Sequence, residues 1–372
     1  MLLKKYEIKA PQVNCFKIMD LNGQIINKEE IIDIDVSLLT HAYKIMNLSR
    51  TYETLAFQYQ RQGRMLTFPP SMGQEAIQVA IGMNFEQHDW YVSGYRNHAT
   101  LLYLGKPLKE IFQYWCGNER GNKSADNLNI TPINVLIGTQ FSHAVGVALA
   151  NKMQNNSSLV FSDIGDGGTS SGEFYSALNW AGVQKLPIIF IIQNNQWAIS
   201  TPTKLQTSSE TLAQKAIGAN ILSFQVDGND LFACYAILKA ARKYVEQNQT
   251  PVLIEALTYR IGPHTTADDP TLYRTSESHK TNLQRDPLVR LKKYLINNKL
   301  WDEKQEEHLI ESQKEIVKMA FKTALDDLAM PLGDIFAYTY ANLPSDLVRQ
   351  QQTLETFFAT KNEVVYEKHK NR

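Results

Sequence analysis

Two apolar segments on either side of a glycine-rich turn most constrain how this chain can fold. The first, residues 159–164, leads into Gly165-Asp166-Gly167-Gly168, and an amphipathic stretch follows. The second, residues 188–193, is rich in β-branched residues and leads into Asn194-Asn195. This pattern predicts a strand–helix–strand unit with a right-handed crossover, which makes the two strands parallel. Asp166 and Asn195 are therefore expected at the same edge of a sheet.

The chemistry of this edge suits a divalent cation that carries a diphosphate. Asp166 offers a charged oxygen and Asn195 a neutral one, and Mg²⁺ takes about six oxygen ligands at ~2.0–2.1 Å, usually shared with phosphate and water. Glycines let the backbone approach a phosphate closely. The N-terminus of the helix expected from about residue 171 favours an anion at the same place. We therefore predict a magnesium diphosphate site.

Other phosphate-binding turns fit the residues less well. Gly165-x-Gly167-x-x-Ser170 is close to the dinucleotide-binding pattern, but Ser170 stands where a third Gly or Ala belongs. The second segment ends in Asn194-Asn195 rather than in an acidic residue that would hold a ribose. No Lys-Ser/Thr pair follows the glycines, which excludes a nucleoside-triphosphate loop.

The pattern of the whole chain predicts an α/β fold with a doubly wound parallel sheet flanked by helices, an N-terminal arm and C-terminal helices. A helix is expected over residues 41–61 and another from about Gln74. Thr207 and Glu210 fit a capping box, and Asp230 fits an N-cap. Residues 258–284 are expected to be a long loop without a regular element, of the kind that is usually functional or disordered. From residue 159 onward the expected order is strand 159–164, helix 171–183, strand 188–193, helix 209–217, strand 221–226, helix 231–247 and strand 252–257.

We predict a division into an arm (1–40), an α/β domain (41–330) and a tail (331–372), with surface helices near the end of the domain. The chain has 38 basic and 38 acidic residues, so no basic surplus points to nucleic acid. Its three cysteines form no metal-binding spacing, and no apolar run approaches ~20 residues. We therefore expect a cytoplasmic protein with no membrane segment.

Several motifs in a fixed order make the chain resemble a known family. The sequence resembles the alpha subunit of the thiamine diphosphate-dependent 2-oxo acid dehydrogenases, in its bacterial pyruvate-type branch. The resemblance covers roughly residues 45–330. The motifs that carry it, beside the glycine turn and the Asn pair, are GQEA at 73–76, GYR at 94–96, IGTQ at 137–140, QNNQWAIST at 193–201 and TYRIGPHTTADDP at 258–270.

The resemblance implies a role for each matching residue. Magnesium would be bound by Asp166, Asn195 and the carbonyl of Trp197. The diphosphate would contact Tyr95, Arg96, Gly167 and Gly168. The aminopyrimidine ring would face Val135 and Ile137, and His264 would lie over the diphosphate and the reacting carbon as the catalytic residue.

Several of these residues also have an ordinary structural interpretation. Val135 and Ile137 are also ordinary core residues by type, Arg96 is by type a solvated surface charge, and an isolated loop histidine such as His264 is more often structural. His98 and His143 are interpreted as structural. Some relatives carry a histidine four residues before the GQEA glycine, where this chain has Pro69.

The resemblance also implies the reaction and the partners. The expected activity is oxidative decarboxylation of pyruvate with transfer of the acetyl group to the lipoyl domain of a dihydrolipoamide acyltransferase. The glutamate that activates thiamine diphosphate belongs to a second domain in this family, so a separate beta subunit and an α₂β₂ heterotetramer are expected. Branched-chain 2-oxo acid or acetoin dehydrogenase subunits, and a non-catalytic cofactor-binding subunit, are the alternatives.

Overall fold

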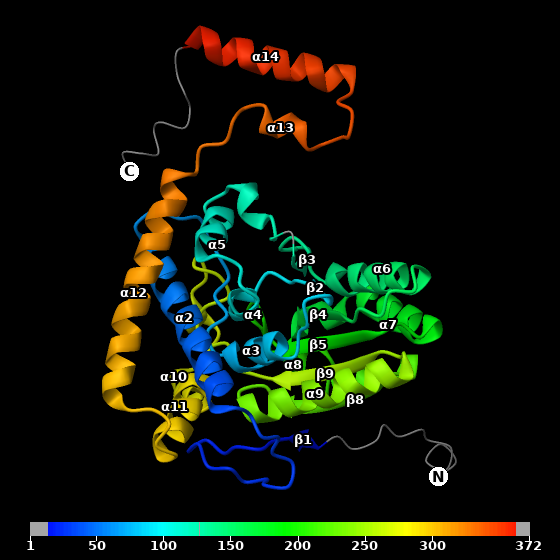
Figure 1. The fold of residues 1–372 in the computed structure, drawn as a ribbon, viewed down its shortest axis with the longest axis vertical. Helices are drawn as coiled ribbons and strands as arrows, with labels where there is room; N and C mark the ends of the chain where they lie inside the picture. The colour runs from blue at the N-terminus through cyan, green and yellow to red at the C-terminus, as the bar shows by residue number, and fades with distance from the viewer. Residues whose placement is uncertain (1–13, 126, 362–372) are drawn as a thin grey trace.

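A computed structural model describes residues 14–125 and 127–361 of the chain, and these residues contain a parallel seven-stranded sheet (Figure 1). A separate antiparallel hairpin consists of two short strands, β6 (Trp197–Ala198) and β7 (Thr201–Pro202). The strands of the sheet are β1 (Cys15–Phe16), β2 (Trp90–Val92), β3 (Asn129–Ile130), β4 (Val160–Gly165), β5 (Ile188–Asn194), β8 (Leu222–Asp227) and β9 (Val252–Leu257). Their spatial order is β1-β8-β9-β5-β4-β2-β3, with every neighbouring pair parallel.

Helices cover both faces of the sheet, which confirms the predicted doubly wound fold. The α-helices are α2 (Val36–Arg61), α3 (Glu75–Met83), α4 (His98–Tyr103), α5 (Leu108–Trp115), α6 (Thr139–Met153), α7 (Gly172–Gln184), α8 (Thr203–Gln206), α9 (Leu231–Asn248), α10 (Ser276–Leu283), α11 (Pro287–Asn297), α12 (Glu303–Asp326), α13 (Asp334–Ala337) and α14 (Ser345–Lys361). Four 3₁₀ helices are η1 (Glu119–Asn122), η2 (Asp166–Ser170), η3 (Ala213–Ala219) and η4 (Pro270–Leu272).

The central strands are buried on both sides, as their mostly apolar sequences predict. Phe161 and Ile189 belong to one hydrophobic core, whereas Val160, Ile188 and Phe190 belong to the other. This alternation follows from the period of two along a strand. Each such side chain contributes about 1.5–3 kcal/mol when fully buried, so the two cores together fix β4 and β5 side by side.

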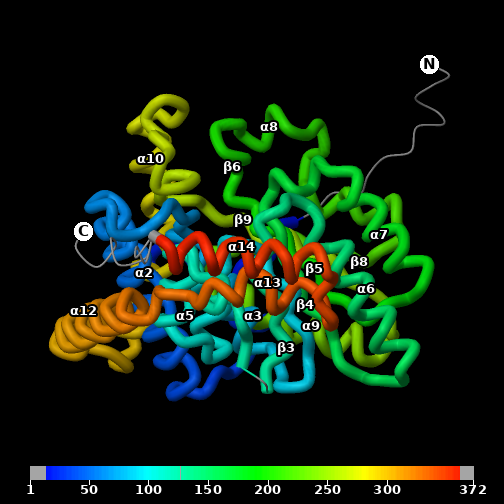
Figure 2. The backbone as a smooth tube through the Cα atoms, turned by 90° about the horizontal axis from the view of Figure 1, so that it is seen from above, coloured from blue at the N-terminus to red at the C-terminus, as the bar shows by residue number. Residues whose placement is uncertain are grey.

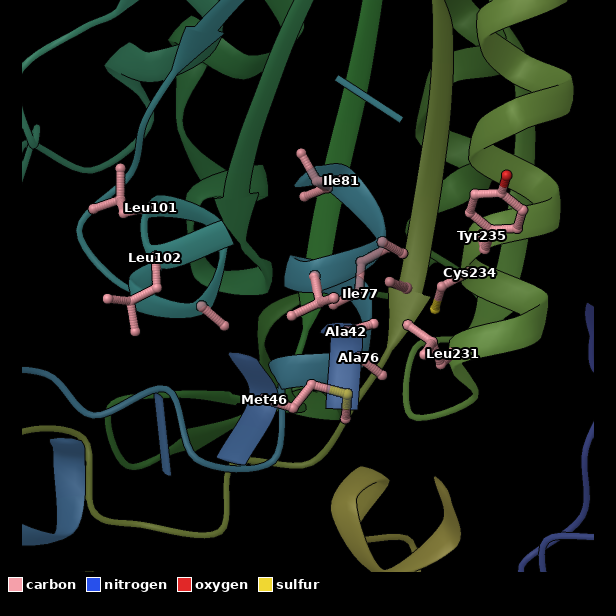
Figure 3. Close-up of a cluster of buried hydrophobic side chains, with 14 of the residues drawn as sticks. Ala42, Met46, Ala76, Ile77, Ile81, Leu101, Leu102, Leu231, Cys234 and Tyr235 are labelled. Atoms are coloured by element: carbon pink, nitrogen blue, oxygen red, sulfur yellow. The ribbon is translucent and has the colours of Figure 1, made fainter. Parts of the chain in front are cut away.

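Helix α3 is held against the sheet by three neighbouring helices (Figure 3). Its side chains Ile77 and Ile81 lie in one cluster with Met46 of α2, Leu101 of α4 and Leu231 of α9. The first turn of α3 is thereby fixed near the carboxyl ends of the central strands.

The connections of the sheet create a switch point between β2 and β4. The chain leaves β2 toward β3 on one side and leaves β4 toward β5 on the other. Ligands of open α/β sheets bind in the crevice outside the carboxyl ends of the strands at such a point.

Most predicted elements are confirmed to within a few residues, and two predictions were wrong. The helix expected over 209–217 does not form, and the 3₁₀ helix η3 overlaps its second half. The Thr207 hydroxyl accepts from the Ser209 amide (3.2 Å) rather than from the Glu210 amide, so no capping box forms. The stretch 258–284, expected to be a loop, contains η4 and α10. Their N-caps are Asp269 and Thr275, polar residues that begin a helix as readily as they form a turn.

Both ends of the described chain lie at the periphery (Figure 1). Seen from above, α13 and α14 cross over the middle of the molecule (Figure 2). Strand β1 pairs with β8 at one edge of the sheet, and α14 follows α13 beyond the end of α12, away from the sheet. Residues 1–13 and 362–372, parts of the predicted arm and tail, lie outside the described residues, so the three-part division stays a prediction. No helix in the described ranges combines the length and the apolar character needed to cross a membrane.

Candidate functional site

A cavity of about 230 Å³ lies at the switch point between β2 and β4. It is bounded by the segment after β2, the turn after β4, the segment after β5 and the loop that carries His264. Every residue predicted for the site except Val135 lines this cavity, namely Tyr95, Arg96, Ile137, Asp166, Gly167, Gly168, Asn195, Trp197 and His264.

Asp166 and Asn195 follow two neighbouring strands directly. The register pairs Gly165 of β4 with Gln193 of β5. Asp166 and Asn195 therefore lie just beyond the last paired residues of two strands whose backbones are ~4.8 Å apart. The Asp166 carboxylate is buried, and among the described residues it accepts side-chain hydrogen bonds only from neutral groups, Gln206 Nε2 (2.9 Å) and Thr203 Oγ1 (3.2 Å). Burial raises the pKa of Asp166, against the effect of these two bonds. A buried carboxylate without an ion-pair partner is costly, and a cation in the cavity would offset that cost.

The two asparagines face different surroundings. Asn194 donates to Glu255 Oε1 (2.7 Å) and does not line the cavity. Asn195 donates through Nδ2 to Gln74 Oε1 (2.8 Å), and its Oδ1 accepts from the Trp197 amide (3.2 Å). A side-chain oxygen has two lone pairs, so Asn195 Oδ1 keeps one acceptor site for a cation.

Gly167 marks a close approach of two backbone segments. A Cβ atom at this position would lie 2.8 Å from Ala198 Cβ, a contact that no rotation of a side chain relieves. A residue other than glycine would push the turn after β4 away from the hairpin that carries Trp197. The sequence prediction of a turn that needs glycine is explained by this contact as well as by access to phosphate.

Arg96 and His264 are bound to each other at one side of the cavity. Arg96 is 8% exposed and donates through Nη2 to both the backbone oxygen (2.9 Å) and Nδ1 (3.0 Å) of His264. Arginine cannot accept a hydrogen bond. His264 Nδ1 is therefore the acceptor, and the neutral ring carries its proton on Nε2.

Arg260, which was not predicted from the sequence as a site residue, is a buried cation beside the site. It is fully buried, donates to the Trp197 carbonyl (2.9 Å) and the Ile199 carbonyl (2.7 Å), and leaves its Nε without a partner. Burial and the neighbouring charges of Arg96 and Arg274 lower the pKa of Arg260 to about 10. The Trp197 carbonyl, a predicted metal ligand, thus already accepts one hydrogen bond.

Three arginines around the cavity lack a carboxylate in ion-pair contact in the part of the chain that the structure describes. Within the described residues, no carboxylate forms an ion pair with Arg96, Arg260 or Arg274. Unpaired buried cations favour an anionic ligand. Nor does this part of the chain contain a cluster of three His, Cys, Asp or Glu residues that could hold an ion alone. A metal at Asp166 would therefore share its coordination with the ligand.

We expect His264 to stay neutral in the cofactor-free protein at pH 5.5. Burial, followed by the charges of Arg96 and Arg260, lowers its pKa to about 3, far below the ordinary histidine value of about 6.5. The imidazole therefore binds a proton only well below pH 5. Nitrogen-15 shifts of labelled histidine, assigned with His264→Gln, should report the Nε2–H tautomer between pH 5.5 and 8. A titration of this ring near pH 6.5 would contradict the described contacts.

The other predicted or questioned residues lie as follows. Val135 is 52% exposed and lies outside the lining, whereas Ile137 lines the cavity and is 51% exposed. His98 is fully buried away from the cavity, with Nδ1 2.7 Å from Glu53 Oε1, and Nε2 accepts from Trp115 Nε1 (3.1 Å). His143 is exposed on α6 and does not line the cavity. Pro69 is buried and does not line it either.

Five further polar residues of the lining were not predicted: Gln74, Asn97, Gln140, Asp163 and Gln193. Gln74 and Gln193 fall inside the motifs GQEA and QNNQWAIST, but nothing in those motifs alone says what the side chains contact. In the sequence, Asp163 could have been singled out as a charged residue inside a mostly apolar strand segment. Such a residue needs buried partners.

Fold and cavity together define the class: a doubly wound α/β protein whose polar cavity at the switch point suits an anionic ligand. The family model "Dehydrogenase E1 component" matches residues 43–332, and the chain belongs to this family of thiamine diphosphate-dependent enzymes.

Curated relatives span nearly the whole chain. A pyruvate dehydrogenase E1 component subunit alpha of Acholeplasma laidlawii is 43% identical over 90% of this chain and 97% of the relative. Proteins of the same name from Mycoplasma pneumoniae and Bacillus subtilis are each 38% identical, over 92% and 93% of this chain and 96% and 94% of the relatives. The resemblance inferred from the motifs is thereby confirmed.

Proposed function

We propose that this chain is the alpha subunit of a pyruvate dehydrogenase that uses thiamine diphosphate and Mg²⁺. The enzyme would decarboxylate pyruvate and transfer the acetyl group to the lipoyl domain of a dihydrolipoamide acyltransferase. The observation that carries the proposal is the placement of Asp166 and Asn195, two side chains with oxygen atoms, at the ends of adjacent parallel strands beside buried arginines that form no ion pair within the described residues. The names of the relatives support the choice of pyruvate.

The residues of the cavity fit the cofactor. Asp166, Asn195 and the free lone pair of the Trp197 carbonyl would ligate Mg²⁺, an ion that prefers oxygen ligands and commonly shares them with phosphate. Arg96 and Tyr95, with the backbone of Gly167 and Gly168, would hold the diphosphate. Arginine suits this task because its planar fork donates to two phosphate oxygens at once.

The remaining residues would orient the reacting end. Bound thiamine diphosphate supplies an electron sink that lets a 2-oxo acid lose carbon dioxide. Ile137 offers an apolar contact for the cofactor ring. The same role is proposed for Val135 on the basis of the family resemblance alone. Because Nδ1 of His264 is occupied by Arg96, Nε2–H is the group left to donate to an anion or to move a proton near the reacting carbon.

We further propose that a beta subunit completes the site in an α₂β₂ heterotetramer. Among the cavity-lining residues of the described chain, the carboxylates belong to Asp163 and Asp166, and none belongs to a glutamate. The glutamate that activates the cofactor in this family would thus come from the other subunit.

A side-by-side substrate assay tests the proposed specificity. The alpha and beta chains are purified together, loaded with thiamine diphosphate and Mg²⁺, and assayed with pyruvate, 3-methyl-2-oxobutanoate and acetoin. We expect kcat/KM for pyruvate to exceed that for either competitor by at least about tenfold, since the methyl and branched side chains differ by two methylene equivalents at about 1–3 kcal/mol each. A preference for 3-methyl-2-oxobutanoate or acetoin would contradict the assignment of pyruvate. Activity with none of the three would contradict the enzymatic role.

A further inference from the structure

A buried chain of side-chain amides runs beneath the cavity from β4 to the first turn of α3. Each member has less than 5% of its surface exposed. The members are Asn97, Gln193, Gln78, Gln74 and Asn195, and the chain begins at the carboxylate of Asp163.

The direction of every hydrogen bond in this chain follows from its charged end. A carboxylate only accepts, so Gln193 must turn its Nε2 toward Asp163 and thus its Oε1 away from it. Gln193 Oε1 accepts from Gln74 Nε2 (2.7 Å). Gln74 Oε1 is therefore left to accept from Asn195 Nδ2 (2.8 Å). Asn195 consequently has its oxygen, rather than its NH₂ group, on the side of the Trp197 amide and the cavity.

A second fixed point supports the same direction. Gln78 Oε1 accepts a hydrogen bond from the Ala99 amide (3.2 Å). Because the Ala99 amide is a backbone donor, the direction of this bond cannot reverse. Its Nε2 therefore donates, to the Arg96 carbonyl (2.7 Å) and to Gln193 Oε1 (3.0 Å). Gln193 is thus held with its oxygen toward two donors and its NH₂ toward Asp163.

Asp163 is built to remain an acceptor. It accepts from Tyr91 Oη and Asn97 Nδ2 (2.9 Å each) as well as from Gln193, and no Lys or Arg of the described chain pairs with it. Burial raises the pKa of Asp163 to about 6, whereas these hydrogen bonds lower it, and the three converging donors favour the ionised carboxylate. An unpaired buried charge in a central strand does not serve the core, which points to a role at the site.

We propose that Asp163 is a positioning residue whose carboxylate, acting through Gln193 and Gln74 and together with the Trp197 amide, holds Asn195 with its oxygen toward the metal. The inference rests on the proposed function, because only a bound cation gives the orientation of Asn195 a consequence. An asparagine at 163 would aim an NH₂ group at one of the three donors that now converge on the carboxylate. Gln193 would then meet an NH₂ group at position 163 while Gln78 still requires its oxygen on the opposite side, which would weaken the link to Gln74 and Asn195.

The test is the Mg²⁺ dependence of thiamine diphosphate binding by the co-purified alpha and beta chains, read from quenching of tryptophan fluorescence. Asp163→Asn should raise the Mg²⁺ concentration at half-saturation by about tenfold, which corresponds to ~1.4 kcal/mol. Asp89→Asn is the matched control, since Asp89 is an equally buried aspartate that pairs with Arg242 outside this network. We expect this control to leave the Mg²⁺ midpoint unchanged even if it lowers the melting temperature.

A second variant separates positioning from general damage and serves if Asp163→Asn fails to fold. Gln74→Leu removes the middle link without changing charge, and it should raise the midpoint similarly. Because both changes act on one series of hydrogen-bonded side chains, the Mg²⁺ midpoint of the double variant should be no higher than that of the more severe single variant. An unchanged midpoint in both single variants, or fully multiplicative effects in the double variant, would overturn the positioning role alone. If the wild-type complex showed no Mg²⁺-dependent binding, the proposed function would fail and this inference with it.

Discussion

Asp166→Ala should abolish Mg²⁺-dependent binding of thiamine diphosphate, with at least about a hundredfold loss of affinity, or ~2.7 kcal/mol. The substitution removes the one charged oxygen of the proposed metal site, and the neighbouring Asn195 and Trp197 supply only neutral oxygens. Calorimetry of the complex with the beta chain, with Mg²⁺ and with a chelator, measures the effect. In the wild type the chelator should weaken binding strongly, whereas in the variant it should change nothing.

Two controls keep this result interpretable. Asp166→Asn retains an oxygen without the charge, so its loss should be smaller than that of the alanine variant. The melting temperature of the cofactor-free alanine variant should fall little, because the lost hydrogen bonds from Gln206 and Thr203 are offset by removal of a desolvated charge. Tight, metal-dependent binding by Asp166→Ala would refute the metal assignment.

The isolated chain should show almost no pyruvate decarboxylation, at least about 10²–10⁴-fold less than the complex, the range that a positioned acid or base supplies. No glutamate lines the cavity in the described part of the chain. The mouth of the cavity also leaves an apolar segment, Val135 to Ile137, more than half exposed to water. A second subunit that brings a glutamate and covers this segment would account for both observations.

An artificial electron acceptor makes this measurement independent of the acyltransferase. The alpha chain, the beta chain and their mixture are assayed at equal concentration, and activity should rise only on mixing. Full activity of the alpha chain as a monomer would rule out a site shared between two subunits.

The sequence predicted the central part of the fold because strong local signals coincide there. The segments that became β4 and β5 are mostly apolar, and their connection has the length of a helix. The polar residues that follow them mark the edge of the sheet. The parallel register then brings Asp166 and Asn195 to neighbouring strand ends without further information.

The remainder depended on contacts between residues far apart in the chain. Arg260 reaches the Trp197 carbonyl across 63 positions, and Gln74 reaches Asn195 across 121. No local pattern encodes such pairs. The error at residues 209–217 has a local cause, since the side chain of Thr207 bonds the nearby Ser209 backbone in a turn and competes with helix initiation.

The most direct test of the account is a crystal structure of the alpha–beta complex grown with thiamine diphosphate and Mn²⁺ in place of Mg²⁺. Anomalous scattering then locates the metal without reference to any expected geometry. We predict one peak in each cavity, within about 2.0–2.3 Å of a side-chain oxygen of both Asp166 and Asn195 and of diphosphate oxygens. Cofactor bound with no metal between these two strand ends, or a metal held elsewhere in the chain, would contradict the account.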